Sequence, residues 1–460
     1  MKSSQISCPL NEAAYFSSDC PAVLCGSRKL SYTQLHHCVS ATAQHLEKIG
    51  LKPGQRVAVV DFNRWEYLVL LLALWRMRCV ACPLSYRFPH STLINLLRNL
   101  DCQLLVSSHP EVLSSRRTPL RKLRFEDVVS FRPGTIGETP LKTFKISLDQ
   151  PATIIHTSGS SGDPKAVLHT YGNHYFNALG ANENMPFKPG DCWLLSLPLY
   201  HVGGLGILFR ALLGKAAIVV PQKNQEPLEA ILKYQITHLS LVATQLHRIL
   251  QNKANLKRLS SLKAILVGGG PIPTSLFEKS LQYGLPVYLT YGLTEMASQV
   301  ATSQEIVFDP SRPQVKILKH RKLKISSTGE IWVQGPALFK GYVKKGKISL
   351  PLKKGGWFPT GDMGTLDDEG CLLVAGRKDN MFISAGENIY PEEIEKKLYE
   401  LGGIEKALVV PVASEEFGFR PIAFLKPKKG VKVDGARIRS SLEQSLPHFK
   451  IPDVFYEWPN

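Results

Sequence analysis

The sequence predicts an α/β protein with a large N-terminal domain, made of two α/β subdomains and a small β-barrel-like subdomain, followed by a small mobile α+β C-terminal domain. The chain has 460 residues, 44% of them hydrophobic, which is enough for more than one core. Strand-like and helix-like patterns alternate as far as Thr290, as βαβ units with mainly parallel sheets do. After that point short β-like runs dominate, and a mixed segment closes the chain.

The first alternating stretch supplies one α/β subdomain. It is predicted to contain amphipathic or apolar helices at Tyr32–Ile49 and Trp65–Met77, and strands at Arg56–Asp61 and Leu104–Ser107. A further buried strand is expected at Pro151–His156.

The second alternating stretch supplies the other α/β subdomain. Its short apolar runs predict strands at Asp191–Leu197, Ala216–Pro221, His238–Val242, Ala264–Val267 and Val287–Thr290. The windows between them predict helices at Glu226–Tyr234 and Thr244–Gln251.

The predicted secondary structure of the remaining sequence changes twice. From about Gln304 to Ala375, β-like runs are broken by glycine and proline, which predicts an all-β patch. A helix is then expected at Tyr390–Leu398, with strands at Ala407–Val412 and Pro421–Leu425. We therefore expect one domain over residues 1–376 and a second over 377–460.

The charge balance favours anionic ligands. Lysine and arginine outnumber aspartate and glutamate by 56 to 38, for a net charge of +18. The basic residues are scattered and form no nucleic-acid module, so small anionic molecules are a better interpretation than nucleic acid. A basic scaffold or nucleic-acid protein stays open as a different class of function, and it would bind polynucleotides in a salt-sensitive way.

The number of cysteines and the length of the apolar runs indicate where in the cell the protein is expected to be. Nine cysteines, an odd number spread along the chain, do not form a disulfide framework, so we expect a reducing cytoplasm. Cys79 and Cys82 are expected to be buried structural thiols rather than metal ligands. The longest apolar run, Tyr67–Trp75, is too short to span a bilayer, and stable membrane insertion is not expected. A homodimer is compatible with the sequence.

One glycine- and hydroxyl-rich stretch is predicted to hold phosphate. Thr157-Ser-Gly-Ser-Ser-Gly-Asp-Pro-Lys165 lies between two apolar segments, which argues against a flexible linker. Its glycines allow several backbone N–H groups to converge on one anion, its hydroxyls add donors, and its lysine adds a charge. The spacing does not fit a Walker A loop.

Further motifs follow predicted strands. Gly268, Gly269 and Gly270 permit close approach of a flat ring, although such a run is more often a plain turn. Tyr291-Gly-Leu-Thr-Glu295 offers an aromatic face, a hydroxyl and a carboxylate for a base and a hard cation. Asp362 follows a tight turn, where it could accept both ribose hydroxyls, and Arg377 lies at the domain junction.

The order of these motifs resembles that of the adenylate-forming superfamily, which contains acyl-CoA synthetases, nonribosomal adenylation domains and luciferases. The matching residues are Thr157–Lys165, Tyr291–Glu295, Thr360–Asp362 and Gly376–Asp379. Within the superfamily, His169–His174 and Leu197–Arg210 are most similar to the 2-succinylbenzoate-CoA ligases of menaquinone biosynthesis. The resemblance covers nearly the whole chain.

The resemblance implies an ATP-dependent, AMP-forming ligase that activates a carboxylic acid through an acyl-adenylate and passes it to CoA. The triphosphate would be bound by the loop, and Glu295 would hold Mg²⁺. The ATP-binding residues implied are Thr157, Ser158, Gly159, Ser160, Ser161, Gly162, Lys165, Gly268, Gly269, Gly270, Tyr291, Gly292, Thr294, Asp362 and Arg377. The catalytic group would be Thr157, Lys165, His201 and Glu295.

The same resemblance assigns the acid, the hinge and the thiol side. His201, Gly204 and Arg210 would bind the acid, with Arg210 gripping the remote carboxylate of a succinyl group through a bidentate pair. On this basis an Arg210→Ala variant is expected to raise KM for succinylbenzoate far more than for ATP. The hinge falls at Asp379, a short polar residue that must change its backbone angles, and Gly386 and Glu387 would face CoA. Another aryl or medium-chain acid, or a carrier-protein thiol in place of CoA, stays open.

The printed sequence departs from the superfamily pattern at one place. Superfamily members carry a lysine in a terminal P-x-x-x-x-G-K pattern, and the sequence from Leu446 to Asn460 stops where that pattern would begin. Lys450 lies too early to match it. A truncated sequence, an enzyme with impaired or otherwise supported adenylation, and a nucleotide-binding homologue without catalysis are the three interpretations.

Overall fold

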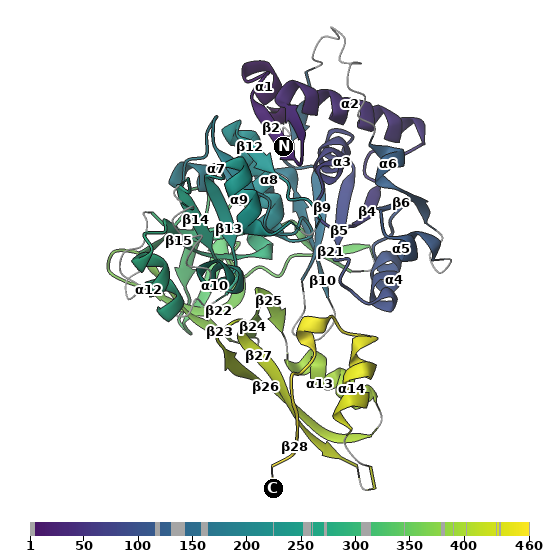
Figure 1. Ribbon diagram of the computed structural model, residues 1–460, viewed down its shortest axis with the longest axis vertical. Coiled ribbons are helices and arrows are strands. Elements are labelled where there is room, and N and C mark those ends of the chain that lie inside the picture. The colour runs from purple at the N-terminus through teal and green to yellow at the C-terminus, as the bar shows by residue number, and fades with distance from the viewer. Residues whose placement is uncertain are drawn as a thin grey trace.

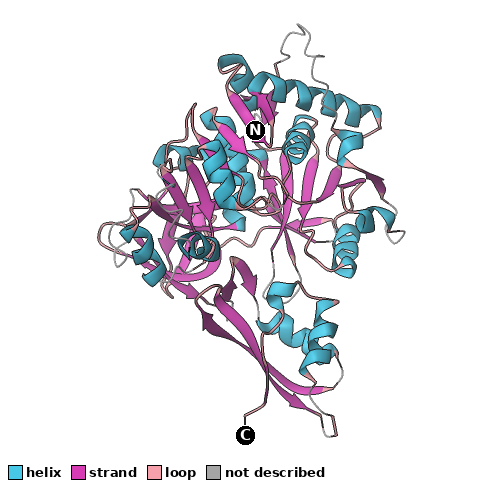
Figure 2. Ribbon diagram, in the orientation of Figure 1, coloured by secondary structure: helices cyan, strands magenta, loops and turns pink. Residues whose placement is uncertain are grey.

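The computed structural model describes residues 5–459 except 116–119, 130–142, 158–163, 224, 252–258, 260, 271–273, 305–313, 345, 379–381, 390, 402, 429 and 432–433. Two large sheets and their helices form the upper part of the molecule, and a smaller module lies below them (Figure 1). Figure 2 shows that helices cover both large sheets, whereas the lowest part is a long twisted hairpin with helices on one side.

The first large sheet has eight strands in the order β21-β20-β10-β9-β5-β4-β6-β7. Its core is parallel, as the alternating pattern predicted, and β10 returns antiparallel to β9. Its strands are β4 (Arg56–Val60), β5 (Val80–Leu84), β6 (Leu104–Ser107), β7 (Arg121–Leu123), β9 (Pro151–Thr157), β10 (Lys165–Thr170), β20 (Gly341–Lys344) and β21 (Lys347–Ser349).

The second large sheet has nine strands in the order β17-β16-β15-β14-β13-β11-β12-β2-β3. It is parallel from β2 to β15 and antiparallel at both edges. Its strands are β2 (Pro21–Cys25), β3 (Arg28–Ser31), β11 (Cys192–Leu194), β12 (Ala217–Val219), β13 (His238–Leu241), β14 (Ala264–Val267), β15 (Val287–Leu293), β16 (Ser298–Ser303) and β17 (Val315–Ile317).

Helices form three layers around the two sheets. Apolar side chains alternate along β4, so that Val57 and Val59 face one core while Ala58 and Val60 face another. The helices of the upper part are α1 (Pro9–Phe16), α2 (Tyr32–Lys48), α3 (Trp65–Arg76), α4 (His90–Asn99), α5 (Pro110–Ser114), α6 (Phe125–Val128), α7 (Tyr171–Asn184), α8 (Val202–Gly214), α9 (Pro227–Tyr234), α10 (Ala243–Gln251) and α12 (Thr274–Gln282). Helices α3, α7 and α8 share the core between the sheets, α4 packs outside the first sheet, and α9, α10 and α12 pack outside the second.

The predicted β-rich stretch is distributed over three sheets. Strands β18 (Lys322–Ile325), β19 (Glu330–Gln334), β22 (Phe358–Leu366) and β23 (Leu372–Arg377) form an antiparallel sheet of their own. Strand β17 instead extends the second large sheet, and β20 with β21 extends the first. The remaining pair, β1 (Gln5–Ser7) and β8 (Lys145–Ser147), lies apart from these sheets.

A C-terminal module, defined here as β24 to β28 with α13 and α14, has its own sheet and core. It contains β24 (Phe382–Ser384), β25 (Glu387–Ile389), α13 (Pro391–Glu400), β26 (Ile404–Ser414), β27 (Gly418–Pro427), α14 (Gly435–Glu443) and β28 (Phe455–Glu457). Strands β26 and β27 are longer than predicted and form the hairpin seen in Figure 2. The predicted hinge residue Asp379 lies outside the described residues.

Candidate active site

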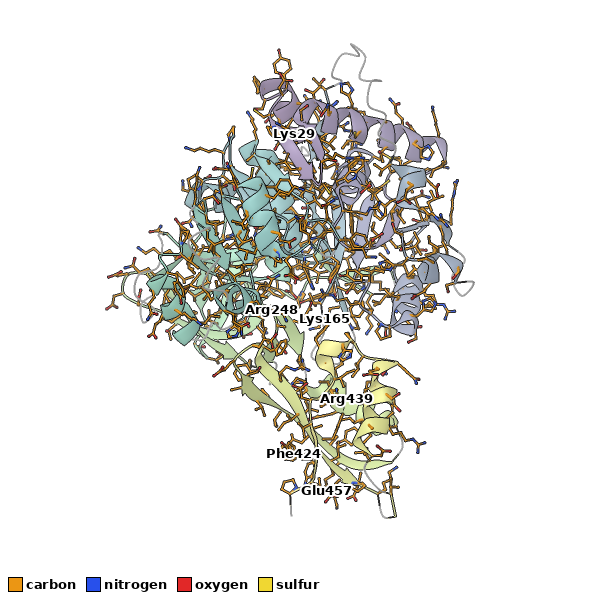
Figure 3. All side chains as sticks on the ribbon, viewed as in Figure 1. Lys29, Lys165, Arg248, Phe424, Arg439 and Glu457 are labelled. Atoms are coloured by element: carbon orange, nitrogen blue, oxygen red, sulfur yellow. The ribbon has the colours of Figure 1, made fainter. Side chains whose placement is uncertain are left out.

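A cleft of about 2230 Å³ lies where the parallel strands of both large sheets end and the C-terminal module begins. The last residues of β9, β13, β14 and β15 line it, together with Ile383, Gly386 and Glu387 of the C-terminal module. The carboxyl ends of parallel strands commonly form such sites, because the loops that follow them converge at one edge. Figure 3 shows Lys165 and Arg248 at the level where the upper part meets the C-terminal module.

The cleft brings together most of the predicted site residues. Those lining it are Thr157, Lys165, His201, Arg210, Gly268, Gly269, Gly270, Tyr291, Gly292, Thr294, Glu295, Asp362, Gly386 and Glu387. The loop residues Ser158, Gly159, Ser160, Ser161 and Gly162 lie outside the described part of the chain. Arg377 is described only through its main chain, which pairs with Asp362 across β22 and β23.

The two ends of the glycine-rich loop are fixed by neighbouring strands. Thr157 ends β9 and Lys165 begins β10, and the two residues are direct partners in the antiparallel register. The Lys165 ammonium lies 5.5 Å from the centre of the Tyr342 ring, and the Tyr342 hydroxyl donates to Glu295 Oε1 at 2.7 Å. The lysine and the carboxylate are therefore held at the same end of the cleft by one aromatic ring.

Two predicted nucleotide residues are directly bonded. The Tyr291 hydroxyl donates to Asp362 Oδ2 at 2.6 Å, and the Asp362 backbone N–H donates to the Thr360 hydroxyl oxygen at 3.0 Å. Asp362 is 8% exposed. This geometry orients a carboxylate and an aromatic ring from two different sheets toward one part of the cleft.

The glycine run after β14 is packed too closely to tolerate side chains. A Cβ added at Gly268 would lie 2.5 Å from Thr290 Cγ2, and one added at Gly270 would lie 2.9 Å from Ile383 Cγ2. Gly269 has φ +84°, which favours glycine. The run therefore lets β24 of the C-terminal module approach the end of β14.

Arg210 lies on α8 at the base of the cleft and is 2% exposed. Its guanidinium stacks 4.3 Å from the centre of the Trp193 ring, and it donates to neutral acceptors on Asn182, Gln299, Ala181 and Met185. Among the described residues no carboxylate forms an ion pair with it. Burial and the nearby Arg321 lower the pKa of Arg210 to about 9, so it is charged at neutral pH.

The charged group of Arg210 is less free than the sequence predicted. A guanidinium has five N–H donors, and four of them are engaged by the four neutral acceptors. One Nη1–H is left, so a carboxylate could receive its charge and a single hydrogen bond rather than the bidentate pair that was expected.

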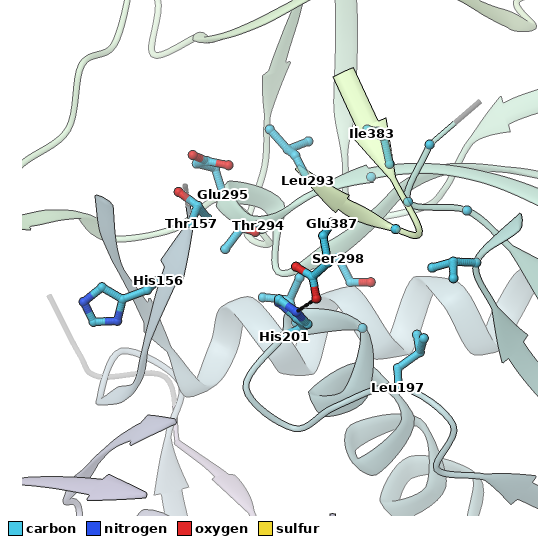
Figure 4. A pocket seen from close by; sticks show the side chains of 18 of the residues that line it. His156, Thr157, Leu197, His201, Leu293, Thr294, Glu295, Ser298, Ile383 and Glu387 are labelled. Carbon is cyan, nitrogen blue, oxygen red and sulfur yellow. Dashed lines mark hydrogen bonds and ion pairs between the residues drawn. The ribbon is translucent and has the colours of Figure 1, made fainter. Parts of the chain in front are cut away.

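His201 and Glu387 meet across the cleft, one from each side of the junction (Figure 4). His201 Nε2 lies 3.3 Å from Glu387 Oε1, with the two side chains 40% and 20% exposed. Burial acts to raise the pKa of Glu387, but His201, Arg87 and Lys450 outweigh it, and the net pKa is below its usual value. The pair links the start of α8 to the turn between β24 and β25.

The prediction that Gly204 contacts the acid is not supported. Gly204 does not line the cleft, and a Cβ there would lie 2.2 Å from the Pro198 carbonyl oxygen. This glycine allows α8 to pack against the preceding loop. Gly203 and Gly206 line the cleft in its place.

Sequence reasoning missed Tyr342 and Gln299. Tyr342 holds Glu295 from a strand that follows it by more than forty residues, and Gln299 accepts from Arg210 at 3.2 Å. Gln299 is a buried polar residue in β16, and that is the only local signal; Tyr342 has none, because the contact depends on β20 pairing with β10.

Two further findings concern the described residues. No group of three or more histidine, cysteine, aspartate or glutamate side chains in this part of the chain could hold a metal ion alone. None of its helices combines the length and apolar character needed to cross a bilayer.

Comparison with known proteins places this geometry in a family. Residues 10–343 match the family model described as AMP-binding enzyme. The 2-succinylbenzoate–CoA ligase of Bacillus licheniformis is 33% identical over 461 residues, covering 97% of this chain and 95% of that ligase.

Solved structures of the Bacillus subtilis o-succinylbenzoate CoA synthetase are also similar. A double mutant bound to a product analogue has TM-score 0.87 and 26% identity, over 99% of this chain and 96% of that one. The complex with its acyl-adenylate intermediate has TM-score 0.72 at the same identity, over 99% and 95%. The chain therefore belongs to the AMP-binding enzyme family.

Proposed function

We propose that the protein is an AMP-forming acid–thiol ligase that activates 2-succinylbenzoate with ATP and transfers the acyl group to CoA. The observation that carries the choice of acid is the buried Arg210 at the base of the cleft, which has no carboxylate partner among the described residues. The single carboxylate of a simple fatty acid must react with ATP, so none is left to pair with Arg210. A dicarboxylic acid has a second carboxylate for this charge. The full-length similarity to 2-succinylbenzoate–CoA ligases supports the same choice.

The first half-reaction requires positioning and charge neutralisation. The substrate carboxylate attacks the α-phosphorus of ATP, the bond from that phosphorus to the bridging oxygen breaks, and pyrophosphate leaves. Thr157 and Lys165 stand at the two ends of the loop proposed to hold the β- and γ-phosphates. Tyr291 and Asp362 are proposed to hold the adenosine, because a hydrogen bond joins them and both line the cleft together with Gly268–Gly270.

The residues present fit a magnesium ion that is shared with ATP. Glu295 lines the cleft and is held by Tyr342, and Mg²⁺ in nucleotide enzymes commonly takes one or two carboxylates, with water and phosphate oxygens completing its shell. When bound, the ion neutralises phosphate charge. The hydrogen bond from Tyr342 fixes the orientation of this carboxylate.

The second half-reaction is the displacement of AMP by the CoA thiolate. Gly386 and Glu387, which line the cleft from the C-terminal module, are proposed to border the path of the thiol. The higher TM-score with the product-analogue complex than with the acyl-adenylate complex supports assigning the described arrangement to this step. The hinge near Asp379 and the domains over 1–376 and 377–460 are part of the same proposal.

Gly386→Val should block the second half-reaction selectively. An added Cβ would lie 2.4 Å from Val242 Cγ1, and the residue has φ +81°, so the C-terminal module could not close in the described way. We expect thioester formation to fall about 100-fold while pyrophosphate exchange changes less than about threefold. Gly430→Val is the matched control, because Gly430 has φ +87° in the same module with nothing within 4 Å. Equal loss in both variants would contradict the role of this contact.

Glu387→Gln should reveal a pH-dependent contribution of the His201–Glu387 contact. The pKa of Glu387 is lower in the folded protein than its ordinary value of 4.5. The charged carboxylate therefore stabilises the fold fully above pH 4.5, and this contribution is lost as the pH falls through the lowered pKa. The difference in Tm between wild type and variant should therefore be larger just above pH 4.5 than below it, and it should shrink as the pH falls further. Glu416→Gln removes the exposed ion pair with Arg248 and should change Tm little at any pH. A pH-independent difference for Glu387→Gln would remove the assignment.

The decisive experiment supplies 2-succinylbenzoate, ATP and CoA to the purified protein. Release of pyrophosphate that depends on the acid, followed by a CoA thioester of its mass, supports the proposal. The same assay with benzoate and hexanoate tests the alternative acids, and a carrier protein bearing phosphopantetheine tests the alternative thiol. Binding of ATP and acid without exchange would indicate a homologue without catalysis.

We further propose a cytoplasmic location without nucleic-acid partners. All nine cysteines are free thiols, and Cys79 and Cys82 are buried, as was predicted for structural thiols. The homodimer stays a prediction that sedimentation of the purified chain would test.

A further inference from the structure

Arg210 carries its charge in an entirely neutral hydrogen-bonding shell. Nε donates to Asn182 Oδ1 at 2.9 Å, Nη2 donates to the Met185 carbonyl at 2.9 Å, and Nη1 donates to Gln299 Oε1 at 3.2 Å. The charged side chain that acts on it is Arg321, whose charge has the same sign and lowers the pKa of Arg210. The shell thus satisfies donors without neutralising the charge.

Gln299 is the member of this shell that also lines the cleft. It lies in β16, is 6% exposed, and donates through Nε2 to the Thr302 hydroxyl at 2.9 Å. The Thr302 and Thr290 hydroxyl oxygens lie 2.8 Å apart, and Thr290 donates to the Ala301 carbonyl at 3.1 Å. The side chain therefore connects the guanidinium to a chain of two hydroxyls that ends on the backbone.

The direction of every bond in this chain follows from its ends. The Ala301 carbonyl can only accept, so the Thr290 hydroxyl donates to it. Thr290 therefore accepts from the Thr302 hydroxyl, and Thr302 accepts from the Gln299 amide. Arg210 can only donate, so Gln299 Oε1 must face it. One orientation of the amide satisfies both ends, and the glutamine cannot flip without losing bonds at both.

We propose that Gln299 is a positioning residue that fixes the Arg210 guanidinium and, because it is uncharged, leaves the positive charge available to the second carboxylate of the acid. The inference rests on the proposed function and deepens it by naming a residue that sets selectivity for dicarboxylates. A glutamate at this position would have nearly the same shape and would still accept a hydrogen bond from Arg210 through Oε1. Its negative charge would neutralise the guanidinium and repel the second carboxylate of the substrate.

A purely structural role for the side chain leads to a different expectation. The Gln299 backbone carbonyl accepts from Asn177 and from Arg321, and those bonds survive any substitution of the side chain. If the side chain only supported the fold, its replacement would lower Tm without changing which acids are accepted. Selectivity between acids is therefore the readout that separates the two roles.

The test compares wild type with Gln299→Glu on 2-succinylbenzoate and on its two monocarboxylic analogues, 4-oxo-4-phenylbutanoate and 2-butanoylbenzoate. We expect KM for 2-succinylbenzoate to rise about 30-fold with kcat changed less than about threefold, and KM for ATP to be unchanged. The preference for the dicarboxylate over whichever analogue is activated should shrink by a similar factor. Gln251→Glu adds the same charge on an exposed part of α10 and should reproduce none of this.

Gln299→Met guards against misfolding of the charged variant. It removes the hydrogen bonds of the side chain to Arg210, Thr302 and Thr290 without adding charge. KM for the dicarboxylate should therefore rise less than in Gln299→Glu, and the ATP kinetics should be retained. Retained preference for the dicarboxylate in a folded Gln299→Glu variant overturns the inference, as does an equal loss of preference in Gln251→Glu. Failure of wild type to activate 2-succinylbenzoate would instead overturn the proposed function, so the two failures are distinguishable.

Discussion

Replacing Arg210 with methionine is expected to raise KM for 2-succinylbenzoate about 100-fold while KM for ATP changes less than about threefold. The methionine keeps much of the apolar stem beside Trp193 but removes the charge and the remaining Nη1–H. A second carboxylate would then be transferred from water to the base of the cleft without compensation. Steady-state kinetics with each substrate varied in turn measures the effect.

Arg321→Met is the matched control for that variant. Arg321 is also buried, its pKa is also lowered to about 9, and it donates to the backbone carbonyls of Gln299, Lys319 and Asn177. It does not line the cleft. The control should lower Tm with little selective effect on KM for the acid, and a selective effect as large as that of Arg210→Met would refute the assignment.

Replacing Glu295 with glutamine is expected to reduce acid-dependent pyrophosphate exchange about 1000-fold. Glutamine can still accept the hydrogen bond from Tyr342, so the fold is preserved, but the charge that suits a magnesium ion is lost. Tyr342→Phe should produce a smaller effect, because the carboxylate stays and only its orientation is loosened.

Magnesium-dependent binding of a fluorescent ATP analogue provides the second readout. The affinity of wild type should rise with Mg²⁺ concentration, that of Tyr342→Phe should rise only at higher concentration, and that of Glu295→Gln should respond weakly. An unchanged magnesium response in Glu295→Gln would remove this residue from the metal site.

The sequence predicted the elements of the fold more accurately than their grouping into sheets. Arg56–Asp61 and Trp65–Met77 were placed within a residue or so, because their apolar periodicity is local. Strand β11 is shorter than expected, since the apolar run continues through a loop in which Leu195 and Leu199 are buried without being in a strand. The destination of β20 could not be predicted, because its pairing with β10 joins residues far apart in the sequence.

Residues that line the cleft could be predicted where they belong to short sequence motifs. Thr157, Glu295 and Asp362 all line one cleft: Thr157 ends β9, Glu295 follows β15, and Asp362 lies within β22. Gly204 packs against Pro198 and does not line the cleft, which the sequence could not show because a glycine needed for packing and one needed for a ligand look alike. Gln299 and Tyr342 act through partners on other strands, and a single sequence does not show such pairings.

The two buried arginines also connect folding to substrate binding. Held by neutral acceptors, Arg210 and Arg321 place two like charges inside the free protein, which opposes folding by an amount that the rest of the core must offset. A ligand that brings a carboxylate to Arg210 binds the folded chain and not the unfolded one, and so stabilises it by mass action. The bound acid therefore supplies the negative charge that the interior of the free protein lacks, and the same uncompensated arginine that lowers the stability of the free protein allows it to recognise the acid.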